Sequence, residues 1–298
     1  MSSTLSPSHR ERLKSVSVAT ISTCLFRRGL KHVVVNGIVP VSAHQPRMVG
    51  EAFTLRFVPM REDIDPSSGA GSGTVHQRAF DECPAGFVLV MDTRGETRGC
   101  CCGDLLIARL KARGCAGVVT DGGFRDTPEI ASLGFPAFQQ RPVPAPSFGR
   151  MHAVEINVPI GCSDVAVYPG DIVVGDGEGV VVIPKALANA VAEEAWMQTQ
   201  YDTFAAVPRG AASSAFIPPR RSRGPNSTGG GGQMTDDERP ASSNDRDAEF
   251  TAWLNGLGFT IDAEELSAAR QAFDRLAAMK QMNRAPSRTR RRARGGQQ

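Results

Sequence analysis

The spacing of hydrophobic and polar positions predicts a mixed α/β domain in the first two thirds of the chain. Apolar residues recur at helical spacing over residues 16–29, which predicts a helix. Residues 50–58 (GEAFTLRFV) alternate apolar and polar positions, as in a half-buried strand. Two short apolar runs, FVLVM at 87–91 and GVVT at 117–120, are typical of buried strands. The pattern therefore favours strands and helices that alternate along one domain.

The stretch at 165–184, VAVYPGDIVVGDGEGVVVIP, predicts three strands joined by tight turns. Its separators, Pro-Gly-Asp and Gly-Asp-Gly-Glu-Gly, have the composition of hairpin turns. Residues 186–200 then have the pattern of a helix. We assign residues 1–210 to a single α/β domain with helices at its N-terminus.

The composition changes after Phe216, and we divide the rest of the chain accordingly. Residues 211–245 are rich in Pro, Gly, Ser and Arg and predict a flexible linker. Residues 246–281 predict a short helical segment that is marginal for independent folding, so we expect it to dock on another part. Residues 282–298 form a basic tail that we expect to be disordered and solvated, with binding of RNA or another polyanion as the alternative.

Composition limits the classes of protein to consider. Of the 298 residues, 41% are hydrophobic, which is enough for a sizeable core. The net charge of +3 gives no indication of a nucleic-acid partner for the whole chain. No apolar run approaches the roughly 20 residues of a membrane helix, and the N-terminus lacks a signal peptide, so we expect a cytoplasmic protein without a membrane partner.

Cysteine, histidine and glycine motifs give little sign of function. The seven cysteines include three in a row at 100–102, and their odd number argues against a disulfide framework. We expect reduced thiols without a direct role, with one reactive thiol as the alternative. The five histidines are scattered, which argues against a histidine zinc site. The glycine-rich GAGSGT at 69–74 follows a polar loop and is interpreted as a mobile loop rather than a nucleotide-binding motif.

The best candidate for chemistry is the stretch at 103–129, GDLLIARLKARGCAGVVTDGGFRDTPE. A helix that begins after Gly103 offers free N–H groups and the positive end of its dipole, which bind a carboxylate or phosphate. Gly114 is placed to end that helix. The strand at 117–120 then leads through a glycine turn to Arg125 and Asp126.

The topology of parallel α/β units predicts that these charged residues meet. The carboxyl end of a strand and the start of a neighbouring helix lie at the same edge of the sheet. We therefore expect Asp104, Arg125 and Asp126 at one edge, beside an anion-binding helix terminus. In the alternative interpretation, Asp104 is only a helix-end charge and Arg125–Asp126 only a surface ion pair.

The spacing of these residues resembles a known family. Asp104, Arg125 and Asp126 form the pattern D-x20-R-D, and Glu129 follows. Together with YPGDIVVGDGEGVVVIP at 168–184, this resembles the class II pyruvate aldolases that cleave 4-hydroxy-4-methyl-2-oxoglutarate and 4-carboxy-4-hydroxy-2-oxoadipate. These aldolases share a superfamily with the ribonuclease-E activity regulators, formerly called dimethylmenaquinone methyltransferases. The resemblance covers residues 15–205.

The resemblance implies a fold, an assembly and a metal. It implies a swivelling β/β/α-type domain that forms homotrimers or homohexamers with active sites between subunits. It also implies a divalent cation, Mg²⁺ or Mn²⁺, held directly by Asp126 and through water by Asp104.

The resemblance likewise assigns residues to a 2-oxo acid substrate. Arg125 would contact the keto oxygen of the pyruvyl unit. The carboxylate would be bound at the start of the helix, by Gly103 and the backbone amides of Leu105 and Leu106.

The chemistry of these groups agrees with that assignment. Cleavage of a C–C bond next to a ketone leaves an enolate, so positive charge must be in place at the keto oxygen. A hard cation with oxygen ligands suits this task, and Arg125 adds a donor that stays charged. We predict a lyase that forms pyruvate and also decarboxylates oxaloacetate, with Asp104 and Arg125 as catalytic residues. The general base is not evident, and a metal-ordered water near Asp104 is our hypothesis.

Two other functions stay open. One is a non-catalytic protein that regulates an RNA-processing enzyme such as ribonuclease E; Glu129, part of the fuller aldolase signature, favours the lyase. The other is a lyase for a related 2-oxo acid or sugar acid.

The sequence departs from the aldolases in one region. They supply a further acidic residue from the neighbouring subunit, in the helix after the last strand. Here Gln198 and Gln200 stand at the expected place, with Glu193, Glu194 and Asp202 nearby.

Overall fold

The computed structural model describes residues 5–63, 74–146 and 149–206, together with the isolated helical residues Ala248, Thr251, Ala252 and Ser267. The chain divides into two compact units, residues 1–196 and 197–298, and the boundary falls within the last long helix. Apart from those four residues, the predicted linker, helical segment and basic tail lie outside the described residues, as does most of the GAGSGT motif.

Two capped helices open the first unit. Helix α1 spans Pro7–Ser15 and α2 spans Val18–Arg27. Ser6 and Ser17 precede them, and their side chains accept hydrogen bonds from the backbone N–H groups of His9 and Thr20, which satisfies donors that a helix start leaves unpaired. The helix predicted for 16–29 is thus confirmed as α2 with shorter ends.

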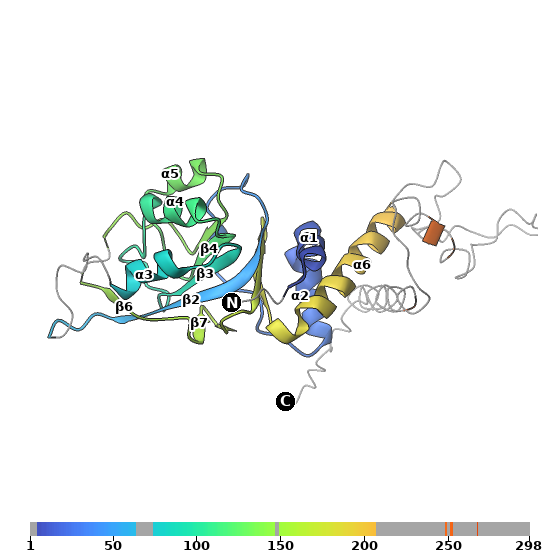
Figure 1. Ribbon diagram of the computed structural model, residues 1–298, viewed down its shortest axis with the longest axis horizontal. Coiled ribbons are helices and arrows are strands. Elements are labelled where there is room, and N and C mark those ends of the chain that lie inside the picture. Colours follow the sequence, from blue (N-terminus) through green and yellow to red (C-terminus); the bar gives the residue numbers. More distant parts are fainter. Residues whose placement is uncertain are drawn as a thin grey trace, which may run out of the picture. The chain divides into compact units, whose positions relative to one another are not determined.

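The main sheet has eight strands (Figure 1), in the order β1-β5-β4-β3-β2-β9-β10, with β6 paired to the far part of β2. The parallel strands are β2 (Met48–Pro59), β3 (Phe87–Asp92), β4 (Gly117–Thr120) and β5 (Ala137–Gln139). The antiparallel strands are β1 (Val39–Pro40), β6 (Met151–Ile156), β9 (Ile172–Asp176) and β10 (Gly179–Ile183). A separate hairpin contains β7 (Ile160–Cys162) and β8 (Val165–Val167). All the predicted strands are present.

The prediction that residues 50–58 form a half-buried strand is wrong in its burial. Strand β2 is central, and it is buried along most of its length. Its polar positions are satisfied inside the protein: Thr54 donates a hydrogen bond to the Val158 carbonyl, and Glu51 pairs with Arg10 at 2.5 Å. A strand with both faces covered can keep polar residues in an alternating pattern when each has a partner.

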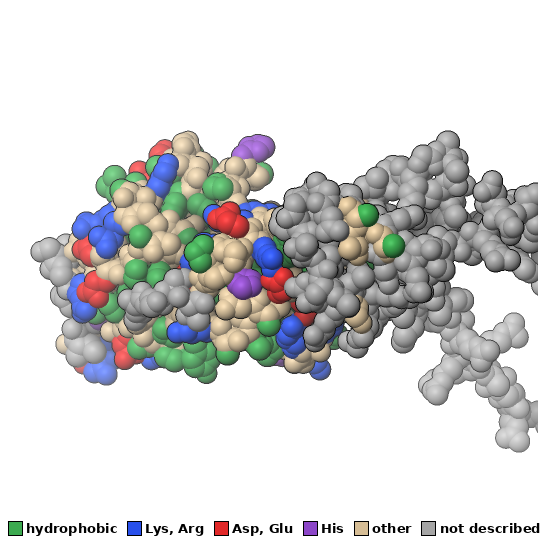
Figure 2. Space-filling model, turned by 45° about the vertical axis from the view of Figure 1, so that its right-hand side comes forward, with side chains coloured by type: hydrophobic (Ala, Val, Ile, Leu, Met, Phe, Trp, Pro, Cys, Tyr) green, Lys and Arg blue, Asp and Glu red, His purple; other side chains and the backbone are tan. Residues whose placement is uncertain are grey.

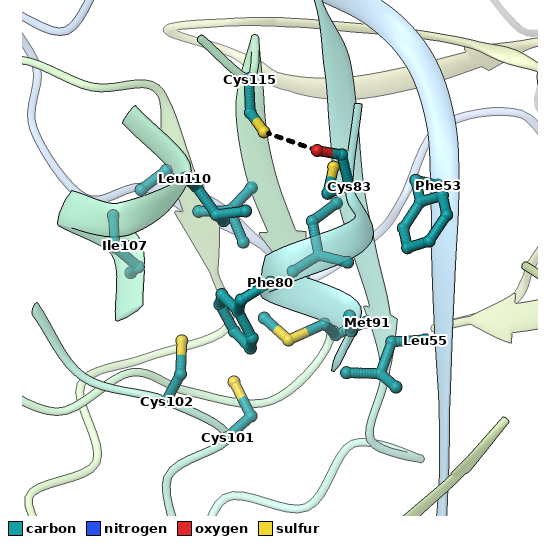
Figure 3. Packing of buried hydrophobic residues seen from close by; sticks show 14 of the residues in the cluster. Phe53, Leu55, Phe80, Cys83, Met91, Cys101, Cys102, Ile107, Leu110 and Cys115 are labelled. Carbon is teal, nitrogen blue, oxygen red and sulfur yellow. Dashed lines mark hydrogen bonds between the residues drawn. The ribbon is translucent and has the colours of Figure 1, made fainter. Parts of the chain in front are cut away.

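Helices cover one face of the sheet and a hairpin covers the other. Helices α3 (Val75–Glu82), α4 (Asp104–Ala112) and α5 (Thr127–Ser132) lie together on one face (Figure 1). Their buried side chains pack with those of β2 and β3 in the cluster shown in Figure 3. On the other face, apolar residues of β9 and β10 pack with the β7–β8 hairpin. This mixed α/β architecture confirms the swivelling β/β/α-type fold.

The last helix, α6 (Ala188–Ala206), follows a short 3-10 turn, Lys185–Leu187. It confirms the helix predicted for 186–200. Within the first unit, two glutamates of α6 fasten it to the N-terminal helices: Glu193 pairs with Arg12 and His9, and Glu194 pairs with Arg27 and Arg28.

Candidate functional site

The candidate site forms where two loops pair at one edge of the sheet. Cys102 and Phe124 make an isolated parallel bridge. The N–H of Arg125 donates to the Cys102 carbonyl at 3.1 Å, and the N–H of Cys101 donates to the Gly123 carbonyl at 2.9 Å. These bonds bring the start of α4 beside the segment that follows β4, as the topology predicts.

Gly103 is the contact point between the two loops. A β-carbon on this residue would lie 2.9 Å from Oδ2 of Asp126 and 3.0 Å from Cγ of Arg125. Its φ of −123° is available to any residue, so glycine is needed here for space rather than for conformation. The structure thus places Gly103, Arg125 and Asp126 in direct proximity.

Arg125 and Asp126 form an ion pair at this edge. Nε of Arg125 donates to Oδ2 of Asp126 at 2.9 Å, and the side chains are 47% and 35% exposed. A solvated pair of this kind contributes about 0–1 kcal/mol to stability, so stability alone does not account for the arrangement.

The backbone of Asp126 has an uncommon conformation. Its φ and ψ are 55° and 41°, in the left-handed region, and it occupies the N-cap position of α5. This conformation costs roughly 1–2 kcal/mol for most residues and less for Asp and Asn. It sets the direction in which the carboxylate leaves the turn. Backbone strain of this kind concentrates at functional sites.

The start of α4 carries the residues that the sequence analysis assigns to anion binding. Asp104 is partly buried in the first turn, Leu106 packs against the core cluster, and Leu105 is 80% exposed. The first N–H groups of a helix lack an intrahelical partner, and Gly103 has no side chain to cap them. The helix ends as predicted, with Arg113 as C-cap and Gly114 at a φ of 76°. Glu129 lies in the first turn of α5 and is exposed.

Asp121 supports the site structurally, and the sequence analysis did not identify it as a site residue. Its side chain is buried and accepts hydrogen bonds from the N–H and hydroxyl of Thr93, both at 2.7 Å. It also accepts from the N–H groups of Gly95 and Ser163, each at 3.1 Å. This carboxylate therefore holds the glycine turn that leads to Arg125. Its place directly after a buried strand was the available signal.

All seven cysteines are free and buried. Burial raises the pKa of Cys24 to about 12 and raises the pKa values of Cys102 and Cys162 well above the usual range. These thiols remain protonated at neutral pH. The hydrogen bond with Cys83 lowers the pKa of Cys115, whose thiol also points to the Cys83 carbonyl at 3.6 Å (Figure 3).

The carboxylates of Asp104 and Asp126 are the groups that would hold a metal. Among the described residues, no cluster of three or more His, Cys, Asp or Glu side chains could enclose one. Mg²⁺ requires no such cage, because it keeps several waters and binds through one or two carboxylates. The Asp126 side chain is 35% exposed, so water can reach its carboxylate. Two carboxylates are the donor set that a hydrated hard cation uses.

Two of the acidic residues near the end of the domain are already paired. Glu193 and Glu194 make the ion pairs to α1 and α2 described above. Asp202 accepts a hydrogen bond from Nε2 of Gln198 at 3.0 Å. Glu193 and Glu194 thus form ion pairs within their own chain, whereas the contact of Asp202 is to a neutral side chain.

The candidate site is partly exposed, with Arg125 and Asp126 reaching the surface. A hollow of about 250 Å³ involves Arg56, Asp92 and Tyr168, and another of about 590 Å³ lies around Arg47 and Asp176. Neither is lined by Gly103, Asp104, Arg125 or Asp126. On the face in Figure 2, acidic and basic side chains of the described residues are interspersed.

Comparison with known proteins identifies the family. Residues 18–182, more than half of the chain, match the RraA-like family described as Aldolase/RraA. The chain belongs to this family. None of the described helices has the length and apolar character needed to cross a membrane.

Individual relatives agree with that assignment. The chain is 36% identical over 126 residues to a "Putative 4-hydroxy-4-methyl-2-oxoglutarate aldolase" of Halalkalibacterium halodurans, a match that covers 42% of this chain and 60% of that protein. It is 34% identical to an uncharacterized protein of Methanocaldococcus jannaschii, over 54% of this chain and 72% of that one. The crystal structure of Streptomyces coelicolor RraAS2, described as an unusual member of the RNase ES inhibitor RraA family, superposes with a TM-score of 0.61 and 29% identity, covering 68% and 98% of the two chains.

Proposed function

We propose that this RraA-like protein is a divalent-metal-dependent lyase that cleaves a 4-hydroxy-2-oxo acid to pyruvate through an enolate. The observation that carries the proposal is the contact of Gly103 with Arg125 and Asp126. This contact joins the guanidinium of Arg125, the carboxylate of Asp126 and the start of α4 at one exposed edge. Relatives named as aldolases support this reading.

The residues of this edge have separate tasks in the proposed reaction. The N–H groups at the start of α4 hold the carboxylate of the 2-oxo acid, which the helix dipole favours. Arg125 donates to the keto oxygen, where negative charge grows as the enolate forms. Asp126 directly, and Asp104 through water, would hold Mg²⁺ or Mn²⁺. When bound, the cation supplies Lewis-acid stabilisation of the same charge.

The ion pair between Arg125 and Asp126 orients both groups before the substrate binds. Because the pair is solvated, Arg125 can exchange its partner for the keto oxygen at little cost. The same enolate arises when oxaloacetate loses carbon dioxide, so we include oxaloacetate decarboxylation in the proposal. The substrate class is thus defined by a pyruvyl unit with a leaving group on its methyl carbon.

We further propose that the protein works as a homotrimer or homohexamer with sites between subunits. The match to the RraA-like family supports this, because the family resemblance is what implied the assembly. Light scattering at micromolar concentration tests it. A monomer would contradict this part of the proposal.

The decisive experiment measures pyruvate released from oxaloacetate and from 4-hydroxy-4-methyl-2-oxoglutarate. The full chain is assayed with Mg²⁺, with Mn²⁺, and after treatment with EDTA. We expect turnover that is lost on chelation and restored by added metal. Turnover that is unaffected by chelation would contradict the metal-dependent mechanism. No turnover of either substrate would favour a regulator that acts through protein contacts.

A further inference from the structure

The loop that carries Gly103 is held on its inner side by a partly buried histidine. Nε2 of His76, in the first turn of α3, lies 2.8 Å from the carbonyl oxygen of Cys101. A carbonyl only accepts hydrogen bonds, so Nε2 must carry the proton and donate it. Cys101 in turn donates its own N–H to Gly123. One residue, Cys101, therefore joins His76 to the segment before Arg125.

The imidazole itself is fixed by aromatic packing. Its ring makes edge-on contacts with Phe57 and Phe80, with centroids 5.9 and 5.2 Å apart. Figure 3 shows Phe80 in the same cluster as the buried side chains of Cys101 and Cys102. Burial lowers the pKa of His76, so the ring is neutral near pH 7. A neutral, packed ring acts as a rigid donor rather than as a mobile charge.

We propose that His76 is a positioning residue that holds the loop at 100–103 in register with Gly123–Asp126. It touches neither the substrate nor the metal in the proposed reaction. It acts through Cys101, because displacement of this peptide would move Gly103 away from Asp126. The catalytic part of this inference rests on the proposed function, whereas the positioning of the loop does not.

Three substitutions separate the hydrogen bond from the packing. His76→Gln keeps a donor near the place of Nε2 but loses the aromatic ring. His76→Asn places its amide nearer to the position of Nδ1, too short to reach. His76→Phe keeps the ring and loses the donor. His44→Gln, at an exposed position in the loop before β2, is the matched control.

The expected results differ for each property. Hydrogen exchange of peptides that cover residues 100–106 should be faster in His76→Phe and His76→Asn, and close to that of the parent in His76→Gln. Mutation of residues that support metal ligands typically lowers affinity or activity by 10–100-fold. We therefore expect His76→Phe and His76→Asn to lose about tenfold or more in Mn²⁺ affinity and in kcat, and His76→Gln to lose less. The melting temperature should depend on the aromatic ring instead, so His76→Phe should melt closest to the parent protein.

Two results would overturn the inference. One is unchanged exchange at 100–106 in both His76→Phe and His76→Asn. The other is a ranking in which Gln is as impaired as Asn, because the defect would then follow packing alone. If His76→Phe does not fold, the comparison of Gln with Asn decides. If the parent protein turns over no 2-oxo acid, the proposed function fails, and exchange and Mn²⁺ binding still decide the role of His76.

Discussion

Oδ2 of Asp126 lies 2.9 Å from the position that a β-carbon on Gly103 would occupy. Two residues on different loops are thus packed so closely that a larger residue at position 103 would have to displace the Asp126 carboxylate. Arg125, whose Cγ would be 3.0 Å away, closes the same gap.

Gly103→Ala should impair function more than folding. The backbone at φ −123° accepts alanine, so we expect only a small change in the melting temperature. The added methyl group must displace the carboxylate of Asp126 or the stem of Arg125. A shift of about 1 Å in such a site can cost on the order of a hundredfold in rate. Pyruvate release and thermal melting measure the two effects, and full activity would show that the contact has no role in turnover.

Arg125→Lys distinguishes a catalytic donor from a surface partner. A surface ion pair would cost about 0–1 kcal/mol of stability and leave turnover unchanged. A donor to the developing enolate should lose about a hundredfold in kcat, because lysine lacks the planar fork of arginine. Arg109→Lys is the control, because it alters an exposed ion pair between Arg109 of α4 and Asp81 of α3. Equal activity of the two variants would exclude Arg125 from contact with the reacting oxygen.

Asp126 should matter more than Asp104 for binding of the metal. We expect Asp126→Asn to weaken Mn²⁺ binding more than Asp104→Asn, because the first is the proposed direct ligand and the second acts through water. Asparagine tolerates the left-handed backbone at position 126, so the comparison reports charge rather than strain. Calorimetric titration with Mn²⁺ measures the affinities. The reverse order would require the two roles to be exchanged.

Asp121→Asn should destabilise the protein without any direct role in chemistry. The amide can accept fewer of the four hydrogen bonds described above, and its NH₂ group would face N–H donors. Buried donors left unpaired cost about 1–3 kcal/mol each, so a loss on the order of 3 kcal/mol is expected. Asp164→Asn, at an exposed position beside Ser163, should change stability little. Denaturant unfolding compares them, and equal midpoints would contradict the structural role of Asp121.

The parts of the fold that the sequence predicts well are those with a local signal. Strand β4 lies at the predicted residues because a short apolar run is bounded by turns on both sides. Gly114 ends its helix as expected because a left-handed C-terminal residue favours glycine. The meeting of Gly103 with Asp126 followed from the topology of a parallel unit.

Other features depend on partners that are distant in the chain. The burial of β2 requires β9 on one side and β3 on the other, which its own residues do not reveal. The hydrogen bond from His76 to Cys101 joins helix α3 to the loop before α4, and a lone histidine carries no pattern. The ion pairs of Glu193 and Glu194 are likewise hidden in the sequence, because their partners lie near the N-terminus of the chain.

The bridge between Cys102 and Phe124 also bears on the order of folding. These residues are separated by one helix and one strand, whereas β2 and β9 are separated by most of the domain. Closing a short loop costs less chain entropy than closing a long one, so local contacts form sooner. The candidate site should therefore assemble before the sheet closes, and pulse-labelled hydrogen exchange during refolding should protect the amide of Arg125 ahead of those that join Gly50 to Val173. A protein built in this way can alter its chemistry within one short segment and leave the slow, long-range pairing of its sheet untouched.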